Sequence, residues 1–263
     1  MDKLFNKYSL VARVYPALLV LAPVLWSSLV LFPGLISGIR NSTVSVLTLG
    51  CALYFLASIA RSRGKRLETR LLAAWGAWPT TIFLRHSDST IDPITKARYH
   101  RALETLGATS LPTPAQEAAD PTGADHLYRS ATKRLIELRR GKSYELVHIE
   151  NESYGFRRNL LALKSTAVSL SSIAALATAE AWWTHMQKPV TAMTIAPSFT
   201  NRPYLPDLLL ADVAYITLFL LVVSAQFVRQ AADEYAYALL RTLDGDTQSS
   251  RPSRRKPRTR KTA

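Results

Sequence analysis

Two acidic side chains lie inside stretches of otherwise apolar sequence. Asp212 is near the start of the apolar stretch 207–228, and Glu180 is near the end of the stretch 165–184. Ionisable residues are costly inside a membrane and usually face a cavity or a partner. In a homo-oligomer these two residues would form acidic rings, and acidic rings favour cations. A pore needs a homo-oligomer, because four helices from one chain do not enclose a sizeable pore; a tetramer is the assembly we expect.

Three hydroxyl groups precede Glu180 on the same predicted helix. Ser165, Ser169 and Ser172 recur at i, i+4 and i+7 and therefore share one helix face. Such a row suits the wall of a wetted pore. Close helix packing, with hydroxyls bonded back to the helix, explains the same row. The candidate pore-lining residues are thus these three serines, Glu180 and Asp212.

Basic residues beside aromatic ones form two candidate surfaces for an anionic ligand. Arg and Lys near aromatic rings suit phosphates and stacked bases. A solvated helix face near anionic lipid is the alternative interpretation. One surface precedes the third apolar stretch and consists of Tyr154, Arg157 and Arg158. The other lies in the middle of the chain and consists of Lys96, Arg98, Tyr99, Arg101, Arg129, Lys133 and Arg134.

Sequence signatures of an enzyme are missing. The chain has no P-loop, no Rossmann glycine pattern, no H-E-x-x-H and no G-x-S-x-G. Its one cysteine, Cys51, excludes an intramolecular disulfide and a cysteine-based metal site. The five histidines lack metal-ligand spacing. We expect a protein that is not an enzyme and that binds no metal or cofactor.

Four apolar stretches would position these residues. Each is about long enough to cross a hydrocarbon core of ~30 Å as a helix. The intervals between them alternate in charge, and residues 61–160 hold 17 Lys and Arg against 11 Asp and Glu. The positive-inside rule therefore predicts a membrane protein with both termini in the cytoplasm. The stretches are roughly 15–37, 43–60, 165–184 and 207–228.

Helix signals also mark the polar middle of the chain. Asp92 followed by Pro93 is typical of a helix start, and Thr113 with Gln116 forms a capping-box pattern. The segment 144–149 suits a short strand or a helix start. After the fourth stretch no breaker occurs, which predicts one long helix that ends near Gly245.

The predicted fold class is all-α: a polytopic membrane protein with two transmembrane helical hairpins, four spans in all, flanking a helical cytoplasmic domain. The expected parts are an N-terminal hairpin at 1–60, a basic cytoplasmic domain at 61–160, a second hairpin at 161–228, a cytoplasmic helix extension at 229–245 and a disordered basic tail at 246–263.

Three stretches resemble a family of bacterial anti-phage membrane effectors. They are IDPITKARYHRAL, PTPAQEAADPTGADHLYRSA and ESYGFRRNLLALK. They are similar to four-span effectors paired with a nucleotidyltransferase, of which the Hailong-type membrane effector is the nearest. The resemblance covers most of the chain and assigns no functional residue. It implies an ion-conducting oligomer that depolarises the host membrane and responds to an oligonucleotide made by the partner enzyme.

The leading functional hypothesis is therefore a homo-oligomeric, ligand-gated ion channel or membrane-disrupting effector. Its partners would be the lipid bilayer, other copies of itself, and a nucleotidyltransferase with its oligonucleotide product. A non-conducting scaffold that holds a cytoplasmic partner at the inner membrane is the alternative. A small transporter is a third possibility, although four spans without repeat symmetry or broken-helix glycines are atypical of transporters.

Overall fold

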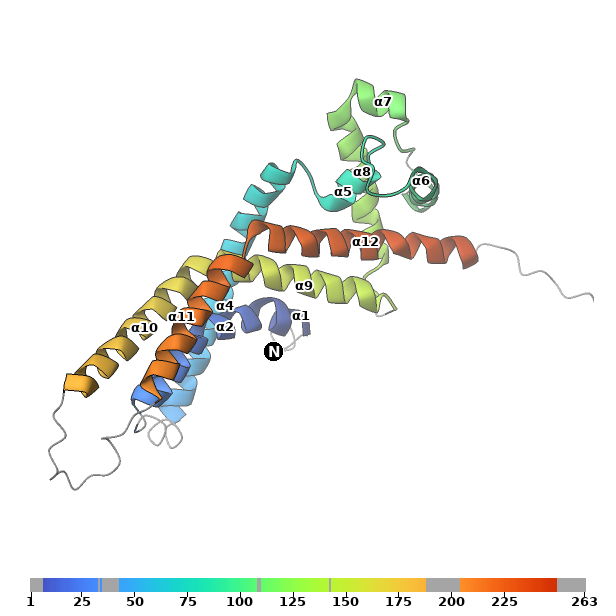
Figure 1. The fold of residues 1–263 in the computed structure, drawn as a ribbon. Helices are drawn as coiled ribbons and strands as arrows, with labels where there is room; N and C mark the ends of the chain where they lie inside the picture. Colours follow the sequence, from blue (N-terminus) through green and yellow to red (C-terminus); the bar gives the residue numbers. More distant parts are fainter. Residues whose placement is uncertain are drawn as a thin grey trace, which may run out of the picture. The chain divides into compact units, whose positions relative to one another are not determined.

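A computed structural model describes residues 7–32, 34, 43–107, 110–141, 143–187 and 204–249. These residues form helices and connections without any strand (Figure 1), so the predicted all-α class is confirmed for the described part. Residues 188–203, between the third and fourth apolar stretches, and the tail from 250 onward lie outside the described residues.

The chain divides into two compact units. The first comprises Met1–Trp75 with Asn151–Ala231, and the second comprises Gly76–Glu150 with Ala232–Ala263. Residues 61–75 and 151–160, which the sequence predicts to be part of the cytoplasmic domain, therefore belong to the unit that contains the apolar helices.

The first unit is a bundle of apolar helices. Figure 1 shows α2, α10 and α11 side by side, and each of these helices packs against the other two. The elements of this unit are α1 (Lys7–Ser9), the π-helix η1 (Leu10–Val14), α2 (Tyr15–Leu31), α4 (Thr43–Trp75), α10 (Lys164–Gln187) and α11 (Leu205–Val222); α9 (Glu145–Ala162) and α12 (Ala225–Ser249) contribute to both units.

Among the described residues, two helical segments are long and apolar enough to cross a membrane, namely Lys7–Leu31 and Leu205–Val222. A third span is found only if α9 and α10, which meet at a bend of 58°, count as one. The described residues thus support two to three spans, not clearly the four that the sequence predicts. In α10 the serines, threonines and Glu180 lower the apolar character of the helix, which explains why it does not qualify alone.

The fourth apolar stretch does not continue as one helix, so this prediction is wrong. Helix α11 ends at Val222, Val223 has an extended backbone, and α12 begins at Ala225. The Ser224 hydroxyl accepts a hydrogen bond from the Phe227 N–H at 3.2 Å and so caps the new helix. Helix α12 also continues past Gly245, the predicted end, and ends at Ser249. A glycine lowers helix propensity but does not force a helix to stop.

The second unit is a helical domain around an apolar core. Its own helices are α5 (Pro79–Leu84), α6 (Pro93–Gly107), α7 (Pro114–Ala119) and α8 (Pro121–Leu138). Each begins with proline, which suits the first helical turn because its missing N–H would have no partner there. The largest fully buried apolar side chains of this core are Leu84, Leu103, Tyr128, Leu135, Leu239, Leu240 and Leu243.

Predicted helix caps in this unit are confirmed. The Asp92 carboxylate accepts from the Thr95 N–H at 2.8 Å, and Thr113 and Gln116 form a reciprocal capping box. Residues 145–149 are the first turns of α9 and Tyr144 directly precedes them, which resolves the choice between strand and helix start. At Gly76, φ is +84°, a conformation that favours glycine, and here α4 ends before α5 begins.

A buried carboxylate of α7 binds both the loop after α5 and helix α8. Glu117 accepts hydrogen bonds from the His86 N–H at 2.8 Å, the Ser87 N–H at 3.0 Å and the Tyr128 hydroxyl at 2.7 Å. Burial alone would raise the pKa of the Glu117 carboxyl. The hydrogen bonds outweigh burial and lower this pKa from its ordinary value of 4.5 to about 2.

Acid should therefore destabilise the second unit through Glu117. Because the folded-state pKa is below the unfolded one, this contribution is complete above pH 4.5 and is lost as the pH falls towards 2. Thermal unfolding followed by circular dichroism at pH 7 and pH 3 should show a smaller acid-induced loss of stability in Glu117→Gln than in the parent chain. The exposed Glu137→Gln is the control. Equal acid sensitivity of Glu117→Gln and the parent chain would contradict this role.

Candidate functional site

A fully buried carboxylate lies among three apolar helices of the first unit. Asp212 of α11 has no exposed surface. Its oxygens accept hydrogen bonds from the Trp26 indole N–H at 2.7 Å, the Ser27 hydroxyl at 3.2 and 3.3 Å, and the Thr178 hydroxyl at 3.2 Å. Trp26 and Ser27 belong to α2 and Thr178 belongs to α10, so the carboxylate joins all three helices.

Small residues let α10 approach its neighbours at this site. Its buried positions are Ala167, Ser171, Ala174, Ala175 and Thr178, which follow helical spacing along one face. Small residues at such an interface allow close backbone approach between helices. The Ser171 hydroxyl donates to the Ala167 carbonyl at 2.7 Å, so it needs no partner on another helix.

The Thr178 hydroxyl has two acceptors within reach. It lies 3.2 Å from Asp212 and 3.0 Å from the carbonyl oxygen of Ala174 one turn earlier. One hydroxyl carries one proton, so it donates fully to only one of them at a time. The Trp26 indole N–H has Asp212 as its one acceptor among the described residues. The Trp26–Asp212 bond, which is also the shortest, is therefore the principal one.

Aromatic packing holds the indole in place. The ring of Tyr215, on α11, meets the Trp26 ring edge to face with centroids 5.3 Å apart. Tyr215 also stacks on Phe219 at 4.8 Å, and its hydroxyl donates to the Leu19 carbonyl. Trp26 is thus oriented by α11 on two sides, through its ring and through its N–H.

The predicted pore-lining residues do not share one surface. Asp212 faces the interior of the bundle, whereas Ser165, Ser169 and Glu180 are exposed and Ser172 is half-buried. Asp212 and these serines could line one ion path only if the helices moved relative to one another. Sequence analysis missed Thr178 and Ser171, although the repeat of small residues through Ala167 and Ala174 marks the inner face of α10.

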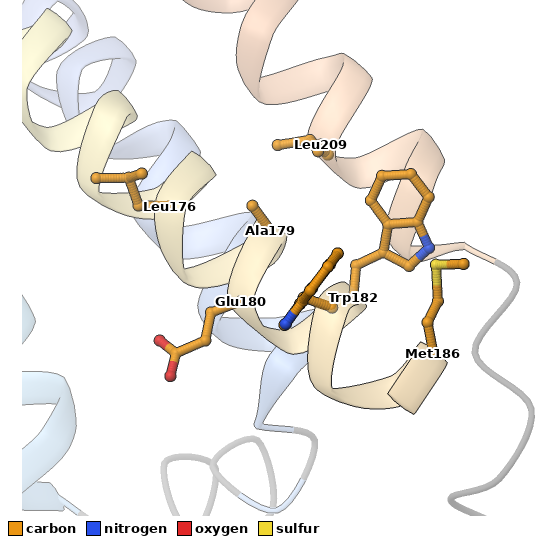
Figure 2. Close-up of a pocket in the computed structure, with 7 residues that line it drawn as sticks. Leu176, Ala179, Glu180, Trp182, Met186 and Leu209 are labelled. Carbon is orange, nitrogen blue, oxygen red and sulfur yellow. The ribbon is translucent and has the colours of Figure 1, made fainter. Parts of the chain in front are cut away.

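Glu180 borders a shallow groove between α10 and α11. Its lining is otherwise apolar, and Figure 2 shows the Glu180 carboxylate directed away from Trp182, Met186 and Leu209. An exposed carboxylate on an apolar surface is costly in lipid. The full lining is Leu176, Ala179, Glu180, Trp182, Trp183, Met186 and Leu209.

The first candidate ligand surface is engaged within the chain. The Tyr154 hydroxyl donates to Glu68 at 3.0 Å, and Arg158 forms an ion pair with the same carboxylate. Arg157 donates to the Phe227 carbonyl at 3.2 Å, with its guanidinium 4.6 Å from the centre of the Phe227 ring. These residues therefore hold α9 against α4 and the start of α12.

A lysine close to this surface binds the helix break in the fourth stretch. The Lys164 ammonium, at the start of α10, donates to the carbonyls of Leu220 at 2.9 Å and Val223 at 2.8 Å. The last carbonyls of a helix have no partner within that helix, and a cation suits the negative end of the helix dipole. Lys164 thereby stabilises the end of α11 at the point where the helix breaks.

The second candidate ligand surface is largely paired as well. Lys96 is buried and donates to the Arg85 carbonyl at 2.6 Å and to the Asp88 carbonyl. Arg98 and the Tyr99 hydroxyl both bind Asp244, at 2.8 and 3.1 Å. Arg101, Lys133 and Arg134 are exposed, and the Nε of the half-buried Arg129 has no hydrogen-bond partner within the described residues.

We expect Asp212→Ala to loosen the bundle. The substitution leaves the Trp26, Ser27 and Thr178 donors without their acceptor, at a cost of about 1–3 kcal/mol. Asp212→Asn keeps one acceptor oxygen for Trp26 and should cost less. Asp207→Ala, in the exposed first turn of the same helix, is the control and should cost under about 1 kcal/mol. Thermal unfolding in detergent measures all three. Equal stability of Asp212→Ala and Asp207→Ala would contradict the proposed network.

No known family model, curated protein or solved structure matches this chain.

Proposed function

We propose that this chain is an integral membrane protein of the bacterial inner membrane with four spans and cytoplasmic termini. Two helical segments that are long and apolar enough to cross a membrane, Lys7–Leu31 and Leu205–Val222, support this proposal. So does the run of basic residues that follows the apolar first half of α4, from Arg61 to Arg70. Under the positive-inside rule this run marks the cytoplasmic side.

Within the membrane, copies of the chain assemble around an axis and conduct ions. One observation carries this proposal: the outer face of α10 exposes Ser165, Ser169 and Glu180, while its inner face is occupied by α2 and α11. A carboxylate and two hydroxyls are poorly accommodated by lipid. Other subunits and water would cover them, and a ring of Glu180 side chains would favour cations. A tetramer is the assembly we propose.

Cytoplasmic control fits the remaining charges. Arg101, Arg129, Lys133 and Arg134 are not bound to carboxylates among the described residues, unlike Arg98. We propose that they receive an anionic oligonucleotide made by a partner nucleotidyltransferase, as the resemblance to anti-phage effectors implies. Opening of the pore would then depolarise the inner membrane of an infected cell.

Membrane potential in bacteria expressing the chain tests conduction. A voltage-sensitive dye should report depolarisation with the parent chain and a reduced signal with Ser169→Leu or Glu180→Gln, because the first removes a hydroxyl and the second a negative charge from the conducting face. Thr217→Leu is a matched control, since Thr217 is also an exposed hydroxyl but lies on α11 and bonds its own helix. Depolarisation that is identical in all variants would contradict this path. A parent chain that never depolarises cells, with or without infection, would favour the scaffold.

Ligand control predicts salt-dependent binding of an oligonucleotide to the cytoplasmic surface. Lys133→Glu combined with Arg134→Glu should weaken this binding by at least about tenfold, because two phosphate contacts become repulsive. Arg241→Glu, at an exposed position of α12, is the control for a charge reversal outside this surface. Fluorescence anisotropy of a labelled oligonucleotide provides the measurement. Equal loss of affinity in both variants would indicate nonspecific attraction rather than a site.

A further inference from the structure

Two arginines of the first unit meet where the apolar helices begin and end. Arg13 lies in η1, two residues before α2, and Arg61 is the first charged residue after the apolar first half of α4. Arg13 donates to the Ser9 hydroxyl at 3.3 Å and lies over the Tyr8 ring at 5.8 Å. Among the described residues neither arginine forms an ion pair with a carboxylate.

The positive charges of Arg13 and Arg61 are not balanced by carboxylates among the described residues. Helix α4, which carries Arg61, packs against η1, and Asn159, which binds the Ala12 carbonyl beside Arg13, also borders Gly64 one turn after Arg61. The neighbouring carboxylates are already in use: Glu68 binds Arg158 and the Tyr154 hydroxyl, and Glu152 pairs with Lys7 at 3.6 Å. A pair of like charges held together in this way favours a bound anion.

The backbone around Arg13 is built for close approach. The Asn159 amide, which is almost fully buried, donates to the Ala12 carbonyl at 2.5 Å. A Cβ on Gly155 would meet Ala12 Cβ at 2.9 Å and the Tyr8 hydroxyl at 3.0 Å, so only glycine lets α9 pack so tightly here. These contacts hold η1 in place. It is a π-helix, a conformation that is rare in proteins but often found at functional sites.

We propose that Arg13 and Arg61 bind the phosphate group of an anionic lipid headgroup. Each guanidinium offers several N–H donors in a planar fork that matches phosphate oxygens. Both residues adjoin apolar helical segments, so they lie at the depth of the lipid headgroups if those segments span the membrane. The assignment to a lipid therefore rests on the proposed membrane location. A soluble phosphate has the same chemistry and must be distinguished by experiment.

The test uses the full chain purified in a neutral detergent. Phosphatidylglycerol is added in increasing amounts, and native mass spectrometry counts the lipid molecules that stay bound to the protein. Phosphatidylcholine is titrated in the same way for comparison. The expected result is about tenfold weaker retention in the double variant Arg13→Gln, Arg61→Gln. Arg70→Gln removes an exposed charge from the same helix, about half a turn away around its axis from Arg61, and should retain lipid like the parent chain. Arg61→Gln alone, at an exposed position, replaces the double variant if the latter fails to fold.

Two results would overturn the proposal. One is equal phosphatidylglycerol retention by the parent chain and the arginine variants. The other is displacement of the lipid by inorganic phosphate at millimolar concentration, which would assign the arginines to a soluble anion. Recovery of the chain in the soluble fraction without detergent would instead contradict the proposed membrane location. Phosphate titration of that soluble chain would then test the arginine pair separately.

Discussion

The arrangement of the apolar helices depends on one buried carboxylate. Asp212 has no exposed surface, so its oxygens must be satisfied by donors from other helices. Trp26 and Ser27 come from α2 and Thr178 comes from α10, which fixes the rotation of both helices about their axes. Apolar packing alone would allow many rotations, because these helices are apolar on most of their surface. The polar contact selects one of them.

The orientation of α10 that the Asp212 contact selects also decides which of its side chains are exposed. Once Thr178 and the small residues of α10 face inward, Ser165, Ser169 and Glu180 must face outward. The inner polar groups are satisfied within one chain, whereas the outer ones are left for a partner, for water or for another copy. The two polar faces of α10 therefore differ: one binds the neighbouring helices within the bundle, and the other is exposed.

Much of the positive charge serves structure rather than recognition. Lys164 and Lys96 donate to backbone carbonyls, and Arg157 does the same at Phe227. Such cations satisfy acceptors that a broken helix or an irregular loop leaves without partners. Arg13 and Arg61 differ, because their neighbouring carboxylates already bind other cations. Location in a basic segment is thus a weak guide to which residues can bind a ligand.

Local signals in the sequence determined the helices, their caps at Asp92 and Thr113, and the separation of apolar from basic segments, since each depends on residues a few positions apart. They also indicated that Asp212 was unusual. Only the tertiary structure decided its partners, because Trp26 lies 186 positions away. It also decided that the helix breaks at Val223 and Ser224, where Lys164 satisfies the freed carbonyls from another helix. Helical periodicity predicts which residues share a face, but a neighbouring helix decides which face is buried.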